Sequence, residues 1–292
     1  MHSRDHDQLP LDLAGTSLLD VPFTPAMARA AGLGRSALER MLAEGRVRRL
    51  LRGVYLASTV GETAEVRAAA VGLLVPGGAV VVDRTAAWVH GIAVPGADLL
   101  PPVEALTPAT RRGLGRTLSA TDVTVLARVR VTTPLRTAMD LGRSLAPDRA
   151  QGVLDAVLRE GLCRHRELLA ELPRFGRHGG VVQLRHVVAL ADGRARDAAE
   201  SALRFHWFAA RLPTPVPGAV VEGAGLRLAL GLPTQRFGAV VGVVDPGLVA
   251  RAEALGWRVE ALDPDRVLRG DPALVLRQLE VAYHRQLLRD VS

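Results

Sequence analysis

Arginine side chains gather near the amino end of the sequence, where they could bind phosphate groups. Seven arginines and only two acids lie between Thr24 and Leu56, an excess of five positive charges in a chain whose formal net charge is +7. Guanidinium groups form paired hydrogen bonds with phosphate oxygens and with the edge of guanine. A local excess of this kind is typical of a surface that binds duplex DNA.

Two short helices are predicted to carry the first of these arginines. Thr24 followed by Pro25 is a helix start, and Gly32 fits the left-handed position that ends a helix. Ser36 and Glu39 have the spacing of a capping box, which predicts that a second helix begins at Ser36.

A two-stranded ribbon is predicted after these helices. Gly45 closes the second helix, and strands are expected over 46–51 and 53–57 with a tight turn between them. Two helices followed by such a ribbon form a winged helix-turn-helix. In the usual docking of this motif, the second helix enters the major groove and the flanking elements hold phosphates.

This docking assigns a role to eight side chains. The residues predicted to face base edges are Arg35, Ser36, Glu39 and Arg40. The residues predicted to hold the phosphate backbone or a minor groove are Arg46, Arg48, Arg49 and Arg52. The predicted partner is therefore double-stranded DNA, and a homodimer on repeated half-sites fits the same docking.

The composition leaves a second interpretation open, a small structural or protein-binding domain with ordinary solvated arginines. The chain has no lysine, no asparagine and one isoleucine, which indicates a strongly GC-biased genome in which arginine replaces lysine at the surface. The pI near 11.0 is therefore weak support for a polyanionic partner. The local excess is stronger support, because genome bias does not explain why it is concentrated in one stretch.

Length and composition limit the remaining functions. Aromatic residues make up 3% of the 292 residues, which argues against a stacking platform for single-stranded nucleic acid. Cys163 is the only cysteine, so no disulfide and no thiolate metal cluster can form within one chain. The amino end lacks the apolar segment of a signal peptide, and no apolar run could span a bilayer. We expect a cytoplasmic protein with no membrane partner and no cofactor.

The order of helical and strand patterns predicts a multi-domain α/β protein. The expected parts are a flexible tail over 1–20, the winged helix-turn-helix over 21–60, a mixed α/β middle region with a helical connector over 61–195, and an αβββαβα domain over 196–292.

Three segments of the first half carry a resemblance to a known family. Residues 23–57 resemble the N-terminal winged-helix domain of AbiEi-type antitoxins, which belong to type IV toxin–antitoxin systems. The segments VDRTAAWVHGI at 82–92 and VTTPLRTAMDL at 131–141 are similar to two further motifs of that family, although Asp83 and Arg84 stand where Ser-His is common. The resemblance implies a DNA-binding transcriptional regulator, with a nucleotidyltransferase-type toxin as partner.

The last third is similar to another family, the very-short-patch-repair-like endonuclease domains with a PD-(D/E)xK core. The helix around Glu200 and Arg204 and the segment LGWRV at 255–259 carry this resemblance, which implies a restriction-endonuclease-like fold. The sequence departs from the family at the catalytic strands. The family's aspartate falls on Ala229 and its glutamate within 240–242, where no residue is charged.

This departure predicts a catalytically inactive domain. Metal-dependent cleavage of a phosphodiester needs clustered carboxylates to hold the ion and activate water. No acid lies between Glu222 and Asp245, and Glu200 is expected to be a surface carboxylate that pairs with Arg204 one turn later. We therefore predict no catalytic residue and no metal ligand. Two alternatives remain, an endonuclease with ligands relocated to Glu200, Glu222 and Asp245, and an antitoxin that acts by protein–protein interaction.

Overall fold

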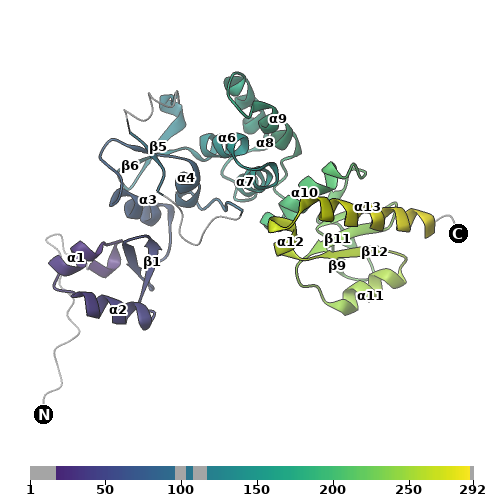
Figure 1. Ribbon diagram of the computed structural model, residues 1–292, viewed down its shortest axis with the longest axis horizontal. Helices are drawn as coiled ribbons and strands as arrows, with labels where there is room; N and C mark the ends of the chain where they lie inside the picture. Colours follow the sequence, from purple (N-terminus) through teal and green to yellow (C-terminus); the bar gives the residue numbers. More distant parts are fainter. Residues whose placement is uncertain (1–17, 96–102, 108–116, 290–292) are drawn as a thin grey trace, which may run out of the picture. The chain divides into compact units, whose positions relative to one another are not determined.

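The structure is a computed structural model that describes residues 18–95, 103–107 and 117–289 (Figure 1). The tail predicted over 1–20 lies outside the described residues except for a 3-10 turn, η1, at Leu18–Asp20. Helices and several small sheets are both present, which confirms the multi-domain α/β class.

The chain divides into two compact units, each described here by itself. The first consists of Met1–Gly91 and Ala97–Thr133, and the second of Ile92–Gly96 and Pro134–Ser292. The predicted domain boundaries at 60 and 195 stay predictions. The structure groups the helices that follow residue 133 with the C-terminal sheet, because one of them packs closely against that sheet's first helix.

The N-terminal helices form where the sequence predicts them. Helix α1 spans Pro25–Ala30, and the backbone N–H of Met27 donates to the hydroxyl of Thr24 at 3.3 Å. Gly32, with φ +81°, follows the end of this helix in the left-handed conformation that the prediction requires.

Helix α2 spans Arg35–Ala43, one residue earlier than predicted. The capping box at Ser36 and Glu39 is wrong, because Gly34 is the N-cap and no side chain caps the helix. The Glu39 carboxylate instead accepts a hydrogen bond from Nε of Arg35 at 2.9 Å, one helical turn away. The Glu39 carboxylate that would accept in a capping box is therefore used in an i, i+4 ion pair with Arg35 on the exposed face of the helix.

The two-stranded ribbon consists of β1 at Val47–Leu51 and β2 at Val54–Ala57, which confirms both strands. The strands are antiparallel, and Gly53 in their turn has φ +81°. One face of the ribbon packs on α1 and α2 through Val47 and Tyr55. The other packs on α3 (Ala64–Gly72) through residues that include Leu56. The ribbon is therefore covered on both faces and is not a projecting wing.

The remainder of the first unit is a small four-stranded sheet with two helices. Its strands are ordered β4-β3-β6-β5, with β3 and β6 parallel. The bounds are β3 Val80–Val81, α4 Asp83–Val89, β4 Ala105–Leu106, η2 Ala120–Asp122, β5 Val123–Leu126 and β6 Val129–Thr132. Residues 123–132 form two strands and not one continuous strand. Ala127 and Arg128 have φ of +45° and +64°, so they form a tight turn that folds the segment into a hairpin.

The second unit begins with the predicted helical connector. Its elements are α6 Pro134–Ser144, α7 Pro147–Arg159, α8 His165–Glu171, η3 Leu172–Phe175 and α9 Val181–Leu190. Within α6, Nε of Arg136 donates to the Asp140 carboxylate at 2.8 Å, and both side chains are buried. The guanidinium of Arg136 also lies 5.3 Å from the ring centre of Phe175. The charged residues of the motif at 131–141 therefore serve packing.

The C-terminal part of this unit is a mixed sheet between helices. Strand order is β12-β11-β10-β7, with β11 and β12 parallel and the other pairs antiparallel. The bounds are α10 Ala198–Ala209, β7 Val216–Pro217, β8 Val220–Val221, β9 Leu226–Arg227, β10 Leu230–Leu232, β11 Phe237–Val241, α11 Pro246–Ala254, β12 Arg258–Leu262, α12 Pro264–Arg269 and α13 Pro272–Arg289.

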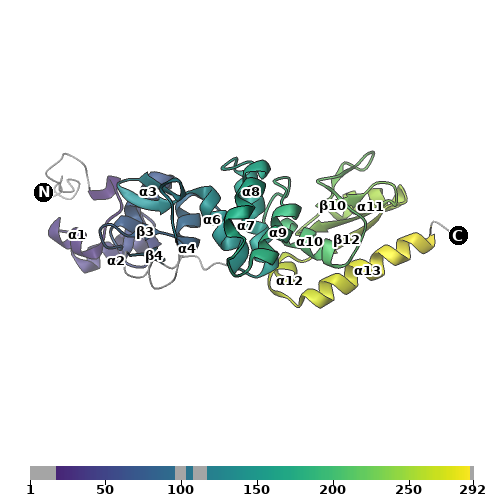
Figure 2. The same ribbon diagram turned by 90° about the horizontal axis from the view of Figure 1, so that it is seen from above.

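The two faces of this sheet have separate apolar cores. Helices α10, α12 and α13 cover one face around Trp207 and Phe237, whose rings lie 5.5 Å apart. Helix α11 and the hairpin β8–β9 cover the other, as the two views show (Figures 1 and 2). Strand β12 ends the sheet on one side, so one of its edges has no neighbouring strand.

Candidate nucleic-acid interface

Helix α2 presents the four residues predicted to face DNA bases on a single exposed surface. Leu38 and Met41 are buried and fix the opposite side of the helix against α1 and the ribbon. The exposed set is Arg35, Ser36, Glu39 and Arg40. The Arg35 side chain is 89% exposed even though it pairs with Glu39, so its guanidinium can still reach a ligand.

A hollow of about 490 Å³ lies between α1, α2 and the ribbon. Leucines and the Tyr55 ring give it an apolar lining, and three arginines add positive charge: Arg29, Arg35 and Arg49. Arg49 and Tyr55 are cross-strand partners, and the guanidinium lies 5.7 Å from the ring centre. The hollow thus joins helix and ribbon into one basic surface.

Two of these lining residues were not assigned to the site from the sequence. The sequence predicts a role in the charge excess for Arg29 and a strand position for Tyr55, but no site contact for either. A two-residue turn at 52–53 would place Tyr55 opposite Leu50, but a register shift between Arg49 and Leu51 places it opposite Arg49 instead. Loop length alone therefore does not predict this pair.

The four ribbon arginines do not share one environment. Arg49 faces the hollow, and Arg52 is exposed in the turn. Arg46 lies 3.8 Å from the Glu44 carboxylate at the exposed end of the ribbon. Arg48 turns the other way, where its guanidinium pairs with Glu62 and donates to the Val60 carbonyl at 2.9 Å. Arg46, Arg49 and Arg52 are therefore accessible to a ligand, whereas Arg48 is held in an ion pair within the protein.

The chemistry available at this surface is anion binding with some base discrimination. Arginine can contact guanine or phosphate in two hydrogen bonds, and a glutamate on the same helix can accept from the amino group of cytosine. The acids that pair with these arginines are themselves exposed, with the Glu39 side chain 60% and the Glu44 side chain 47% accessible. Solvent therefore screens their electrostatic attraction to Arg35 and Arg46.

In the C-terminal domain, the predicted pairing of Glu200 with Arg204 is wrong. Glu200 is 5% exposed, not a surface residue. It accepts from Nη1 of Arg227 at 2.6 Å and from the backbone N–H of Arg196 at 2.8 Å. Burial alone would raise the pKa of Glu200, but these hydrogen bonds outweigh it and hold the pKa below its ordinary value. The ion-pair partner of Glu200 is therefore Arg227 of strand β9, and not Arg204 one helical turn away as the spacing predicts.

Arg204 instead crosses to helix α7, where its guanidinium forms an ion pair with Asp155. Both side chains are buried, and Asp155 also accepts from the amide of Gln151 at 2.9 Å. Burial raises the pKa of Asp155 in spite of the arginine. This cluster joins α7 to α10 and has an architectural role.

The positions aligned with nuclease ligands carry no acid in the folded domain. Ala229 is buried, and residues 240–242 belong to β11 and its end. Asp245 caps α11 by accepting from the N–H of Gly247 at 2.8 Å. In the part of the chain that the structure describes, no three His, Cys, Asp or Glu side chains come together as metal ligands would. Burial also raises the pKa of the Cys163 thiol to about 12, which makes it a poor nucleophile.

The N-terminal region has two short helices followed by a two-stranded ribbon, with exposed arginines on the second helix. This is the helix-turn-helix order predicted from the sequence, although the ribbon does not project as a wing. Residues 20–57 match the family model described as "Transcriptional regulator, AbiEi antitoxin". This segment contains both helices, the ribbon and all eight predicted contact residues.

Two curated relatives align with most of the chain. They are the uncharacterized proteins MT2308 and Rv2248 of Mycobacterium tuberculosis, from the strains CDC 1551 / Oshkosh and ATCC 25618 / H37Rv. Each is 27% identical over 260 residues, which cover 83% of this chain and 95% of the relative. The two relatives therefore align with far more of the chain than the segment that the family model matches.

No solved structure matches the chain. Among the described residues, no helix combines the length and the apolar character that crossing a membrane requires.

Proposed function

We propose that this chain is a DNA-binding transcriptional regulator and that helix α2 is its recognition helix. The observation that carries the proposal is the exposed face of α2, whose arginines continue across a basic hollow onto the ribbon. The match of residues 20–57 to a transcriptional-regulator family supports the same role. A regulator of this kind works on the chromosome, which is consistent with a cytoplasmic location.

The DNA contacts that we propose for each residue follow from its exposure and its side-chain chemistry. Arg35 and Arg40 would contact guanine edges, and Glu39 would accept from cytosine amino groups. Arg46, Arg49 and Arg52 would hold phosphates beside the groove. Arg48 remains a proposed phosphate contact, but its ion pair with Glu62 must be broken or shared for it to act.

Binding to genomic DNA tests this proposal. The full chain is incubated with sheared DNA of its own genome, and the retained fragments are sequenced. Fluorescence anisotropy then compares an enriched site with a mixed-sequence duplex of equal length. We expect Arg40→Gln to reduce the preference for the enriched site by about tenfold, since a bidentate base contact contributes roughly 1–3 kcal/mol.

Arg185→Gln, an exposed substitution on α9, is the matched control and should leave the preference unchanged. Equal binding of the wild type to enriched and mixed duplexes would refute sequence recognition. Absence of measurable duplex binding would refute the whole proposal.

We further propose that the C-terminal domain is non-enzymatic and retains a nuclease-like fold without its chemistry. The support is that two of the three acids considered as relocated ligands are already engaged, Glu200 by Arg227 and Asp245 by the start of α11, while Glu222 is exposed. A nicking assay with Mg²⁺ or Mn²⁺ tests this. Cleavage of plasmid DNA that Glu200→Ala abolishes would establish an enzyme with relocated ligands instead.

A toxin partner is a separate proposal that rests on the word antitoxin in the description of the matched family. The reading frame next to this one in the genome is the first test. A nucleotidyltransferase-like neighbour whose toxicity is relieved by the full chain would support it. Relief that persists after the basic surface of α2 is neutralised would indicate that protection does not need DNA binding.

A further inference from the structure

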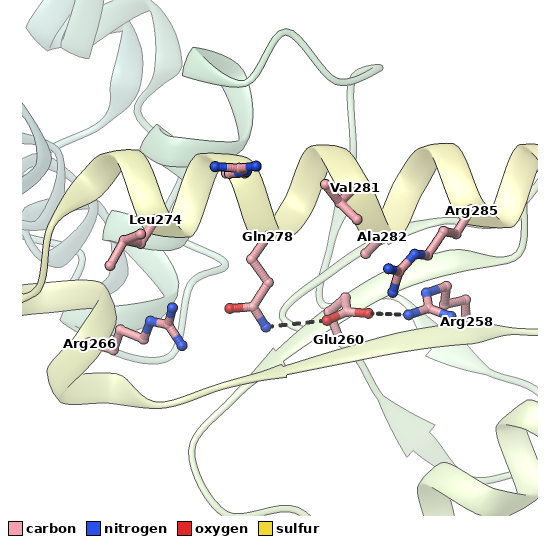
Figure 3. A pocket seen from close by; sticks show the side chains of 9 residues that line it. Arg258, Glu260, Arg266, Leu274, Gln278, Val281, Ala282 and Arg285 are labelled. Carbon is pink, nitrogen blue, oxygen red and sulfur yellow. Dashed lines mark hydrogen bonds and ion pairs between the residues drawn. The ribbon is translucent and has the colours of Figure 1, made fainter.

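A second basic groove lies in the C-terminal domain, far along the sequence from the recognition helix. It has a volume of about 420 Å³ and runs between α13 and the edge strand β12 (Figure 3). Its charged lining comprises one acid, Glu260, and four arginines: Arg258, Arg266, Arg277 and Arg285. The groove therefore has a formal excess of three positive charges.

The one acid in the groove is already engaged. One carboxylate oxygen of Glu260 accepts from Nη2 of Arg258 at 3.0 Å, and the other accepts from the amide of Gln278 at 3.3 Å. Figure 3 shows these two bonds in the middle of the groove, with Arg266 at one end and Arg285 at the other. Glu260 thus offsets Arg258 and leaves the remaining arginines to face solvent.

Three guanidinium groups in this groove have no acidic partner among the described residues: those of Arg266, Arg277 and Arg285. All three side chains are exposed, whereas the arginines that build this domain, such as Arg204 and Arg227, are buried or half-buried in ion pairs. In addition, Nε of Arg258 is buried without a hydrogen-bond partner in the described part of the chain. The groove consequently offers donors that the fold itself does not use.

The geometry fits an extended polyanion better than a single small anion. Arg277 and Arg285 lie eight residues apart on α13, which separates their backbones by roughly 12 Å at 1.5 Å per residue. Phosphates along one DNA strand advance about 3.4 Å each, so a backbone in the groove passes both arginines. The groove is also open along the free edge of β12, which gives a polymer room to enter and leave.

The lining distinguishes between polyanions. It contains no aromatic ring on which unpaired bases could stack. Its exposed apolar side chains are only Leu274 and Val281, too few for the buried anchors of a protein interface. Exposed charged donors without aromatic rings are typical of contacts to the sugar-phosphate backbone of a duplex.

We propose that the groove between α13 and β12 binds the phosphate backbone of double-stranded DNA, as a second contact besides the recognition helix. This extends the proposed function, since it supplies sequence-independent affinity to a chain that reads sequence elsewhere. It gives the C-terminal domain a role that needs no catalytic acid.

The experiment uses four forms of the full chain and one mixed-sequence duplex of about 20 base pairs. The forms are the wild type, a groove variant with Arg277→Gln and Arg285→Gln, a helix variant with Arg35→Gln and Arg40→Gln, and the two combined. A matched control, Arg185→Gln with Arg211→Gln, removes the same charge from exposed sites of the same unit outside the groove. Affinity is measured by anisotropy over a series of salt concentrations, and circular dichroism verifies folding.

We expect the groove variant to lose at least about tenfold in affinity and its log–log salt slope to fall by about 1.8, the value for two lost phosphate contacts. The control should retain wild-type values, and the combined variant should bind more weakly than either alone. A groove variant with wild-type affinity and slope would overturn the inference, whatever the helix variant does.

The two proposals fail in distinguishable ways. If the helix variant keeps wild-type binding while the groove variant loses affinity, the recognition helix is misassigned and the groove stands. If no form binds duplex DNA, both are wrong. If polyglutamate of equal charge displaces the duplex from the helix variant as well as unlabelled duplex does, the groove binds acidic chains in general, and the assignment to phosphate is overturned.

Discussion

The N-terminal helix–ribbon region and the second unit both depend on arginine, but they place its acidic partners differently. In α2 the partner of Arg35 is Glu39, and both side chains are largely exposed. In the second unit Asp155 on α7 and Glu200 on α10 are buried and paired with Arg204 and Arg227. Exposed pairs leave guanidinium groups available to a ligand, whereas buried pairs commit them to the fold. The same residue type is therefore left exposed in one region and built into the fold in the other.

The largest effect expected from this difference concerns Arg204 and Arg35. Arg204→Ala leaves the Asp155 carboxylate buried without its ion-pair partner, so we expect a loss of about 3–5 kcal/mol in the free energy of unfolding. Arg35→Ala removes a pair that water screens, and we expect no measurable loss. Urea unfolding of both full-length variants makes the comparison. Similar stabilities would show that the buried pair does not stabilise the domain.

The second effect concerns the pH dependence of the stability that Glu200 confers. Its pKa is lower in the folded chain than its ordinary value of 4.5, so the unfolded chain binds more protons in acid. The stabilisation is therefore complete above about pH 4.5 and is lost as the pH falls through the lower, folded pKa.

Glu200→Gln should thus cost about 1–3 kcal/mol at pH 7 and much less in acid, because the wild type has by then lost the same contribution. Unfolding at a series of pH values checks this, with Glu253→Gln on the exposed side of α11 as control. A constant difference between variant and wild type across the acid range would contradict the role given to the carboxylate.

How much the sequence could predict also differs between the two regions. In the first, most short-range signals predict correctly: the Thr24-Pro25 start, the left-handed Gly32 and the glycine turn at Gly53 each determine local backbone geometry. The exception is the capping box at Ser36 and Glu39. The exposed face of α2 followed from helical periodicity alone.

In the second region, local spacing misassigned the partners of charged side chains. Glu200 and Arg204 have the i, i+4 separation of an ion pair. In the folded chain, however, Glu200 pairs with Arg227 and Arg204 pairs with Asp155. The groove between α13 and β12 was likewise not foreseen, because its arginines come from three elements that only the folded sheet brings together. Such pairings depend on long-range packing, which spacing along one helix does not encode.

A third, smaller effect separates the ribbon arginines. Arg52 is exposed in the turn. Arg52→Gln should weaken binding to all duplexes alike, by roughly 1 kcal/mol, and lower the salt slope by about 1. Arg48→Gln should change DNA affinity less, because its guanidinium is already paired with Glu62. Anisotropy with a mixed-sequence duplex measures both. A larger loss of DNA affinity for Arg48→Gln than for Arg52→Gln would mean that the ribbon rearranges on binding and breaks the ion pair between Arg48 and Glu62.

The smallest effect tests the helix starts themselves. Thr24→Ala removes the hydroxyl that accepts from Met27, and we expect a loss of about 0.5–1 kcal/mol in stability, in the range of N-cap substitutions. Ser36→Ala should be neutral, because Gly34 is the N-cap of α2 and the serine makes no cap. Thermal unfolding of both variants decides between the observed start and the capping box that the sequence suggests. A loss at Ser36 equal to that at Thr24 would show that Ser36 is the N-cap in solution and that α2 begins two residues later, which would leave Arg35 outside the helix.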